Sequence, residues 1–432
     1  MKKLSVFQTV LVATFGAVAI AAVLIFAFAV SSNSSETVGA VRIWGTLDAS
    51  AVTTVIRQAA ENNQNLAQVS YEQFDEETFN QRLTDALASG QGPDLFFFRQ
   101  DYAFSDASKL IPIPYASLTE SQFNAAFADG ASPFLSQSGV LAIPILGDPL
   151  VMYWNKDTLS AAGYARAPQF WDEIYKVSSD VTKRSDTGSI QKSAIAFGEY
   201  RNVNNAKDIL AMLIMQAGGS ITARDTAGNL VSAVSPRTGE ANQSTANALR
   251  FYTEFADPAK AHYTWNRSLQ ESRKSFAAGD LAIYIGYASE EPLIRRMNPN
   301  LNFAVAAVPQ IRGSSRSTIT GHVYGLAVPR TSRNPSGAAV VGFDLAGAEL
   351  SQALSTALGI PSMRRDVLSL PAEGNDALFN RQAIIMRSWI DPDPEKTEVI
   401  FRDMIENTVS GATLVTEAVQ RADQEMAAML GQ

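Results

Sequence analysis

Charged, amide and aromatic side chains follow a short apolar segment near residue 100. The stretch ALASGQGPDLFFFRQDY leaves a helical pattern at two glycines, passes a Pro-Asp pair and enters the apolar residues 95–98. Pro93 cannot continue a helix, and such a short apolar run is typical of a strand covered on both faces. Ligands of open α/β sheets bind beyond the carboxyl ends of the strands, so residues 99–102 would stand at the rim of a binding crevice. An ordinary polar turn after a buried strand is the alternative.

Glu290 and Glu291, in the segment YASEEPL, are the carboxylate pair that a glycosidase would need. The two carboxyl groups of a glycosidase flank one bond at roughly 5–10 Å, which adjacent residues reach only if the backbone cooperates. We interpret the pair as a solvated acidic turn. The sequence contains no G-x-x-x-x-G-K-[ST], H-E-x-x-H or G-x-S-x-G motif. A carbohydrate-active hydrolase is the alternative to a protein that only binds.

The sequence offers few residues that could carry out thiol chemistry or bind a metal ion. It has no cysteine, which excludes disulfides, thiolate nucleophiles and cysteine-ligated zinc or iron–sulfur sites. His262 and His322 are the two histidines of the whole sequence, and we interpret each as a structural or rim residue. The sequence therefore predicts no cofactor and no metal.

Length favours a two-domain protein, and the net charge argues against two classes of partner. The 432 residues are 46% apolar and 18% charged, enough to bury a sizeable core, and a chain of this length is expected to form two domains. The formal net charge of −8 argues against nucleic acid or anionic lipid as a main partner.

The amino-terminal segment predicts a membrane anchor. Residues 9–30 contain no charged side chain, and as a helix these 22 residues would extend about 33 Å, enough to span a bilayer. Lys2 and Lys3 would hold the amino end in the cytoplasm and the body outside. We expect residues 1–30 to be an uncleaved single-pass helix in the cell membrane, with cleavage as a signal after Ala29 as the alternative. Residues 31–40 read as a flexible tether.

Strand and helix patterns alternate along the rest of the chain. Asp75 is expected to cap a helix that Gly90 closes, and Asp157 to cap a short helix that Gly163 ends. A turn is expected at residues 147–149. The expected strands are residues 41–45, 66–74, 95–98, 140–145, 150–155, 281–287, 302–311 and 324–329, and the further helices begin after Pro168 or cover residues 208–219, 244–258, 335–359 and 398–430.

Five segments in a fixed order resemble a known family. They are LTDALASGQGPDLFFF (83–98), LAIPILGDPLVMYWNKDTLSAAGY (141–164), PQFWDEI (168–174), SFAAGDLAIYIGY (275–287) and FAVAAVPQI with GHVYGLAVPRTSRNPSGA (303–338). In these segments the chain resembles extracellular solute-binding proteins of the maltose-binding type, the substrate receptors of ABC importers. The resemblance covers nearly everything after residue 40.

The resemblance implies an α/β, two-lobed periplasmic-binding-protein type II fold with hinge crossings, here preceded by the N-terminal transmembrane helix. The crossings would lie near residues 144–149, 305–309 and 346–349. The N-lobe would contain residues 41–145 plus 306–347, and the C-lobe residues 146–305 plus 348–432. The implied function is capture of a small solute, most simply a sugar or oligosaccharide, by lobe closure and its delivery to an ABC permease. A receptor that feeds a sensor is the alternative.

The resemblance also implies a set of cleft residues, position by position. Aromatic faces would cover the C–H faces of a sugar, while carboxylates and amides would accept hydrogen bonds from its hydroxyls. For each aromatic residue, packing in the core is the alternative. The expected ligand-binding residues are Trp44, Thr46, Asp48, Arg99, Asp101, Tyr102, Asp148, Tyr287, His322 and Tyr324.

Three departures from the family's pattern stand out. No cysteine is available for lipid attachment, so the apolar helix would have to serve as the anchor. Phe170 stands where threonine is usual before Trp171, which would affect a helix start. Tyr287 and Ala288 replace the commoner Pro-Trp, which leaves the ligand class open.

Overall fold

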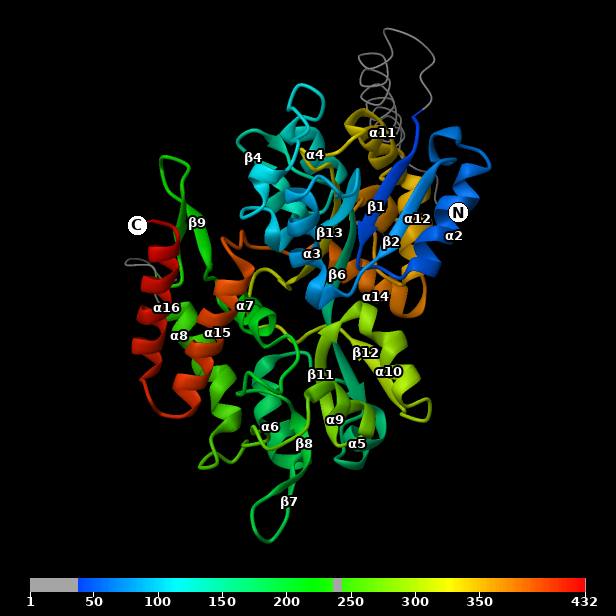
Figure 1. Cartoon of the computed structure of the whole chain (residues 1–432). Helices are drawn as coiled ribbons and strands as arrows, with labels where there is room; N and C mark the ends of the chain where they lie inside the picture. The colour runs from blue at the N-terminus through cyan, green and yellow to red at the C-terminus, as the bar shows by residue number, and fades with distance from the viewer. Residues whose placement is uncertain (1–37, 236–242, 432) are drawn as a thin grey trace, which may run out of the picture.

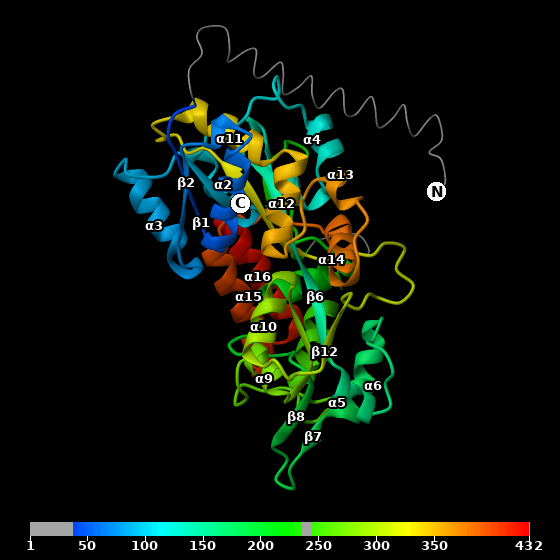
Figure 2. The same cartoon turned by 90° about the vertical axis from the view of Figure 1, so that its right-hand side faces the viewer.

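The structure, a computed structural model, describes residues 38–235 and 243–431. Its helices and strands form two α/β lobes, one above the other in Figure 1 and in the perpendicular view of Figure 2. We call the lobe that contains the first described strand the N-lobe and the other the C-lobe. The α/β two-lobed fold expected from the sequence is confirmed.

One strand is shared by both lobes. The main sheet has nine strands in the order β2-β1-β3-β13-β6-β11-β8-β7, with β12 also paired to β6. Strand β6 (Ile143–Asn155) pairs over residues 143–149 with β13 in the N-lobe, and over residues 150–155 with β11 and β12 in the C-lobe. The turn expected at residues 147–149 is therefore wrong. The backbone stays extended there because Gly147 N donates to Pro361 O and Leu150 N donates to Thr320 O, and a strand tolerates the missing N–H of a proline where no partner needs it.

The N-lobe elements cover both faces of the β2-β1-β3-β13 part of the sheet. Its strands are β1 (Val41–Gly45), β2 (Val69–Gln73), β3 (Leu95–Arg99), β13 (Gly321–Ala327) and the small hairpin β4 (Leu135–Ser136) with β5 (Gly139–Val140). Its helices are α2 (Ala49–Ala60), α3 (Glu76–Ala88), α4 (Glu120–Ala126), α11 (Pro335–Leu345), α12 (Ala348–Leu358), α13 (Arg365–Leu368) and α14 (Gly374–Ile385).

The C-lobe elements surround the β11-β8-β7 part of the sheet. Its strands are β7 (Lys183–Arg184), β8 (Ile190–Ile195), β11 (Leu281–Tyr287), β12 (Phe303–Ala306) and the separate hairpin β9 (Thr222–Arg224) with β10 (Leu230–Ser232). Its helices are α5 (Lys156–Ala161), α6 (Trp171–Val181), α7 (Ala206–Gln216), α8 (Ser244–Thr253), α9 (Ser272–Ala278), α10 (Glu291–Met297), α15 (Pro394–Val409) and α16 (Val415–Met429).

The stretch around residues 86–98 folds as the sequence predicts. Asp75 caps α3 by accepting from Glu77 N, and Gly90 adopts a φ of +67° just after the helix ends. The chain then enters β3, where Phe96, Phe97 and Phe98 are buried. This strand lies between β1 and β13 in the sheet, and the burial of four successive residues, 95–98, shows that both of its faces are covered.

Several local expectations need correction. The helices expected at 335–359 and 398–430 are each broken in two, between α11 and α12 at Gly347 and between α15 and α16 around Gly411. Gly411 has a φ of +72°, which ends a helix that side-chain periodicity alone would continue. The cap of α5 is Asn155, whose Oδ1 accepts from Thr158 N, and Asp157 instead lies in the first turn.

The chain passes between the lobes three times. The first passage is β6, and the second lies between β12 and β13. The passage expected near residues 346–349 falls between α11 and α12, but α12 contacts α2, and α13 and α14 contact α4 and β6, all on the N-lobe side. The chain next reaches the C-lobe at α15, which contacts α7 and α8. The third passage is therefore the segment between α14 and α15.

The predicted membrane anchor, and all but the last three residues of the tether, lie outside the described residues. Of those three, Val38 accepts a hydrogen bond at its carbonyl from Asn334 Nδ2 at 2.7 Å, beside the start of α11. Within residues 38–235 and 243–431, no helix has the length and apolarity needed to cross a membrane.

Candidate functional site

Residues 99–102 lie at the carboxyl end of β3, held there by one amide side chain. Gln100 accepts from Val323 N at 2.6 Å and donates to Gly321 O at 3.4 Å, so both its ends are fixed to β13. The short 3₁₀ helix Gln100–Tyr102 therefore turns away from the sheet immediately after the strand. This places Asp101 and Tyr102 beyond the sheet edge, where the sequence predicts a crevice.

Arg99 and Asp101 form a two-point ion pair. Arg99 Nε donates to Asp101 Oδ1 at 3.0 Å, a second nitrogen donates to Asp101 Oδ2, and Nη1 reaches Glu76 Oε1 on α3 at 2.5 Å. Burial would raise the pKa of Asp101, but the Arg99 guanidinium outweighs it and lowers that pKa to about 2. The guanidinium also lies 5.8 Å from the centre of the Tyr102 ring.

His322 and Tyr324 project from β13 beside this pair. Tyr324 lies opposite Arg99 in the ladder with β3, and His322 lies opposite Asp148 in the ladder with β6. Residues two apart on a strand share a face, so both rings lie on the same side of the sheet. Burial, with the nearby Arg99, lowers the pKa of His322 to about 4, so the imidazole is neutral at physiological pH.

A hydrogen-bond chain joins His322 to Asp208 on α7 through Tyr287. The Tyr287 hydroxyl donates to Asp208 Oδ2 at 2.8 Å, and His322 Nε2 lies 3.0 Å from the same hydroxyl oxygen. A phenol has one proton, and a carboxylate can only accept, so the proton in the second bond belongs to His322 Nε2. This fixes the neutral tautomer of His322 as Nε2–H and leaves Nδ1 as an acceptor.

Asp148 is the buried carboxyl group of the crossing strand. It is 2% exposed and accepts from Ser289 N at 3.0 Å. Burial raises the pKa of Asp148 to about 7 despite this hydrogen bond. Its side chain therefore lies among C-lobe and N-lobe backbone at the point where β6 passes between the lobes.

The three remaining predicted residues do not join this group. Trp44 is buried in β1 with its ring centre 4.6 Å from that of Phe74, and among the described residues its Nε1 has no hydrogen-bond partner. Asp48 caps α2 by accepting from Ala51 N at 2.9 Å. The Thr46 carbonyl accepts from Gln73 at 3.5 Å. The structure thus brings together Arg99, Asp101, Tyr102, Asp148, Tyr287, His322 and Tyr324.

Sequence reasoning missed the residues that α7 and the third passage contribute. Lys207 is 9% exposed, its Nζ lies 2.7 Å from Asp391 Oδ2, and it stands 5.5 Å above the Trp389 ring. Lys207 also donates to Thr397 Oγ1 at 2.7 Å. The signal that could have pointed to these residues is the charged pair Lys207 and Asp208 directly before the apolar run 209–215, together with Asp391 two residues after Trp389.

A cavity of about 230 Å³ opens beside Trp389. Its lining comes from the N-lobe at Ser132, from the C-lobe at Met215 and the β9-β10 hairpin, and from the third passage at residues 388–390. Trp389 therefore lines the cavity and also lies beneath the Lys207 ammonium. Both lobes and the segment that joins them border this space.

The interpretation of Glu290 as part of a solvated turn is wrong. Glu290 is 7% exposed and accepts from the Tyr284 hydroxyl at 2.6 Å, from Tyr287 N at 2.8 Å and from Arg273 at 3.3 Å. Asn205 Nδ2 also donates to it at 3.1 Å, and these four donors satisfy the buried carboxylate. Glu291 is the first residue of α10 and pairs with Arg295. Glu290 therefore links α9 and the residue before α7 to the end of β11, and Glu291 also accepts from Asn375 of α14 at 2.8 Å.

Comparison with known proteins identifies the family. The family model described as bacterial extracellular solute-binding protein matches residues 48–341, more than half of the chain. The chain belongs to this family. The resemblance predicted from the five sequence segments is confirmed, and the members of this extracellular family are binding proteins rather than enzymes.

Solved structures of other solute-binding proteins share the fold of this family member. An ABC transporter solute-binding protein from Thermotoga lettingae, bound with α-D-tagatose, is 20% identical, with a TM-score of 0.70 over 91% of this chain and 100% of that one. The cyclic α-maltosyl-1,6-maltose binding protein from Arthrobacter globiformis is 15% identical, with a TM-score of 0.73 over 90% and 98%. The GacH receptor of Streptomyces glaucescens, described with acarbose, is 17% identical, with a TM-score of 0.70 over 91% and 98%. No curated protein matches the chain in sequence.

Proposed function

We propose that this solute-binding protein captures a sugar or oligosaccharide between its lobes and delivers it to the permease of an ABC importer. The observation that carries the proposal is the meeting of side chains from both lobes where β6 passes between them. Arg99 and Asp101 come from the N-lobe, Tyr287 and Asp208 from the C-lobe, and His322 contacts Tyr287 across the boundary. A ligand held by both walls stabilises the closed arrangement relative to the open one.

The chemistry of the site supports a polyhydroxyl ligand. Aromatic rings and hydrogen-bonding groups occur together at this site, which is how proteins hold sugar rings. The proteins with the same fold that are named above are described with tagatose, a cyclic maltosyl-maltose and acarbose. We propose Arg99, Asp101, Tyr102, Asp208, Tyr287 and His322 as the ligand-facing residues.

We also propose that residues 9–30 anchor the protein in the cell membrane with its folded body outside. The support is the uncharged run of 22 residues after two lysines. We propose lobe limits of residues 41–149 plus 321–385 for the N-lobe and 150–306 plus 394–431 for the C-lobe, with the intervening segments as connections. These limits follow the packing of α12, α13 and α14 on N-lobe elements.

A closure assay tests the proposal directly. Because the chain has no cysteine, substitutions Ser121→Cys on α4 and Ser160→Cys on α5 give one exposed label site on each lobe of the detergent-solubilised full chain. A bound sugar should bring the labels closer and raise the melting temperature by mass action. Asp208→Ala should weaken both responses. No change in label distance or melting temperature across sugars, oligosaccharides and polyols would contradict sugar capture.

A further inference from the structure

The cations of the interlobe site are already occupied by protein carboxylates. All three protons of the Lys207 ammonium have acceptors: Asp391 Oδ2 at 2.7 Å, Thr397 Oγ1 at 2.7 Å and Pro394 O at 3.3 Å. Arg99 is bound by two carboxylates, those of Asp101 and Glu76. One guanidinium facing two carboxylates leaves one negative charge in excess. Neither cation is free to neutralise an anionic ligand.

Asp208 adds a second carboxylate, which forms no ion pair with a lysine or arginine among the described residues, although it lies near enough to Lys207 to interact with its charge. Its side chain is 28% exposed, its hydrogen bond comes from the uncharged Tyr287 hydroxyl, and His322 Nε2 is 3.9 Å away on a neutral ring. Asp208 lies in the first turn of α7, where the helix dipole offsets part of its charge, equivalent to roughly half an elementary charge. The carboxylate still keeps an oxygen, Oδ1, to which the described residues donate no hydrogen bond.

One further acceptor belongs to the hydrogen-bonded group itself, and one more carboxylate lies near Tyr102. The tautomer of His322 leaves Nδ1 as a lone pair, and the described part of the chain forms no hydrogen bond to it. Glu395, in the first turn of α15, forms no ion pair among the described residues and lies close enough to Tyr102 on the N-lobe to contribute to raising the pKa of its phenol. The site therefore offers acceptors and negative charge, with the neutral hydroxyls of Tyr102 and Tyr324 as its uncharged donors.

We infer that the solute carries a positively charged amino group, which makes it an amino sugar rather than a neutral or an anionic sugar. The inference rests on the proposed function and names the ligand class for the same site. A protonated amine placed between Asp208 and the Arg99–Asp101 pair would donate to Asp208 Oδ1 and supply the charge that the site lacks. A neutral hydroxyl supplies the hydrogen bond without the charge, and a phosphate or carboxylate adds repulsion.

The test compares three chemical forms of one sugar series on the full-length protein in detergent. Glucosamine and its β-1,4-linked di- and trisaccharides are measured by titration calorimetry against the N-acetylated series and against glucose, cellobiose and cellotriose. We expect the amine form to bind at least 10-fold more tightly than the N-acetylated and hydroxyl forms of equal length. Its affinity should fall as salt rises, because charge attraction is screened.

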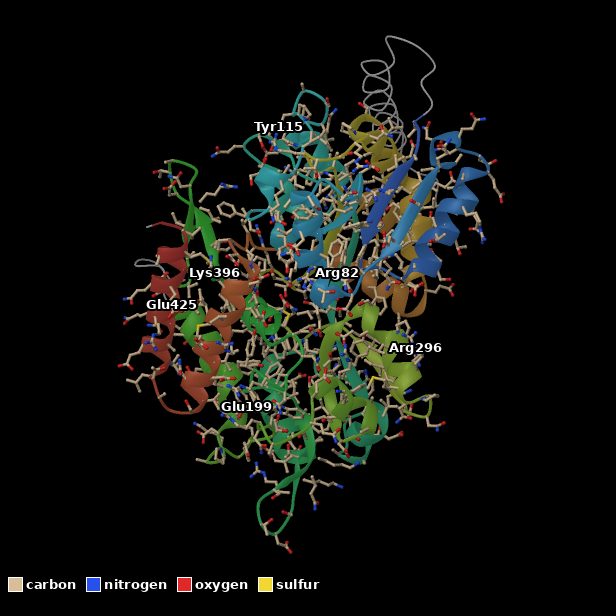
Figure 3. All side chains as sticks on the ribbon, in the orientation of Figure 1. Arg82, Tyr115, Glu199, Arg296, Lys396 and Glu425 are labelled. Carbon is tan, nitrogen blue, oxygen red and sulfur yellow. The ribbon has the colours of Figure 1, made fainter. Side chains whose placement is uncertain are left out.

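A matched pair of variants separates the site charge from the overall charge. Asp208→Asn keeps the shape of the side chain and removes its charge, so the preference for the amine form should fall to less than 3-fold. Glu425→Gln, on the outer side of α16 as Figure 3 shows, removes one charge far from the site and should leave the preference unchanged. Equal or tighter binding of the neutral forms, with lobe closure, would overturn the inference and leave sugar capture standing. No binding by any form in the series, while other neutral sugars close the lobes, would overturn the inference as well, and the absence of closure with every sugar would overturn both proposals.

Discussion

The imidazole of His322, on a strand of the N-lobe, stacks on the phenol of Tyr287, on a strand of the C-lobe, with 4.4 Å between ring centres and 28° between ring planes. The same two side chains share a hydrogen bond, and the Tyr287 hydroxyl donates a second hydrogen bond to Asp208. This contact joins the two strands that flank β6 on either side of the lobe boundary. It couples the orientation of a C-lobe carboxylate to the position of the N-lobe sheet.

Removing one oxygen from Tyr287 should weaken ligand binding. Tyr287→Phe keeps the ring stack but leaves Asp208 without its donor and His322 without its acceptor, so the carboxylate is no longer held in place. Hydrogen bonds to charged groups contribute roughly 1.5–3 kcal/mol, so we expect affinity for a bound sugar to fall about 10- to 100-fold by titration calorimetry. Tyr263→Phe, whose hydroxyl contacts Asn266 elsewhere in the C-lobe, is the control. Unchanged affinity in Tyr287→Phe would argue against this hydrogen-bond chain in binding.

Asp148 should make stability depend on pH. Its pKa is about 7 in the folded chain and roughly 3.9 when unfolded, so folding takes up a proton between these values and stability falls as pH rises from about 4 to 7. Asp148→Asn removes this dependence. We expect the variant's stability relative to the native chain to rise by up to roughly 4 kcal/mol between pH 4 and pH 8, measured by denaturant unfolding. Parallel pH profiles for the two proteins would contradict the assignment.

Replacing Lys207 should lower the stability of the fold, because the buried carboxylate that it pairs with is left without a partner. Lys207→Met strands the buried carboxylate of Asp391, and breaking a buried pair in this way costs about 3–5 kcal/mol. The double variant Lys207→Met with Asp391→Leu should recover most of the loss. Lys396→Met, at the exposed start of α15 (Figure 3), breaks a surface pair with Asp393 and should cost less than about 1 kcal/mol. A double variant as unstable as the single one would show that the two charges are not paired.

Two glycines should respond oppositely to alanine. A Cβ at Gly321, the first residue of β13, would lie 2.4 Å from Asp148 O and 2.8 Å from Pro149 Cα, so the β13–β6 ladder would have to separate. A Cβ at Gly342, inside α11, would meet its nearest atom at 3.6 Å. We expect Gly321→Ala to destabilise by more than about 2 kcal/mol and Gly342→Ala to be neutral or stabilising by up to about 1 kcal/mol. Equal melting temperatures for the two variants would contradict this contrast.

The sequence predicts the strands well where local pattern and tertiary pairing agree. β1 and β11 have the bounds expected from their residues, since every side chain in them is buried except that of Arg42. β6 fails this rule because Gly147, Asp148 and Pro149 are turn-forming residues locally. Their extended conformation comes from backbone partners at Thr320 and Pro361, far away in the sequence, which no local pattern encodes.

The candidate site was predictable in its N-lobe half, and in its C-lobe half only at Tyr287. Arg99 and Asp101 follow a recognisable strand, so their place at the rim follows from general rules of α/β sheets. Asp208 opens a segment that reads only as a buried helix, and Lys207 precedes it. Their roles depend on Asp391 and on Tyr287, which the chain brings to α7 from 184 and 79 residues away.

The continuity of β6 makes each half of the molecule dependent on the other. A cut between residues 149 and 150 would place β3 and residues 143–149 of β6 in one fragment and their shared partner β13 in the other. Each fragment would then present bare peptide groups along a sheet edge, and such edges draw in matching strands from other molecules. The two fragments mixed in solution should therefore reassemble as complementing pairs. Where two cleaved molecules associate incorrectly, we expect them to exchange equivalent fragments, as in domain swapping.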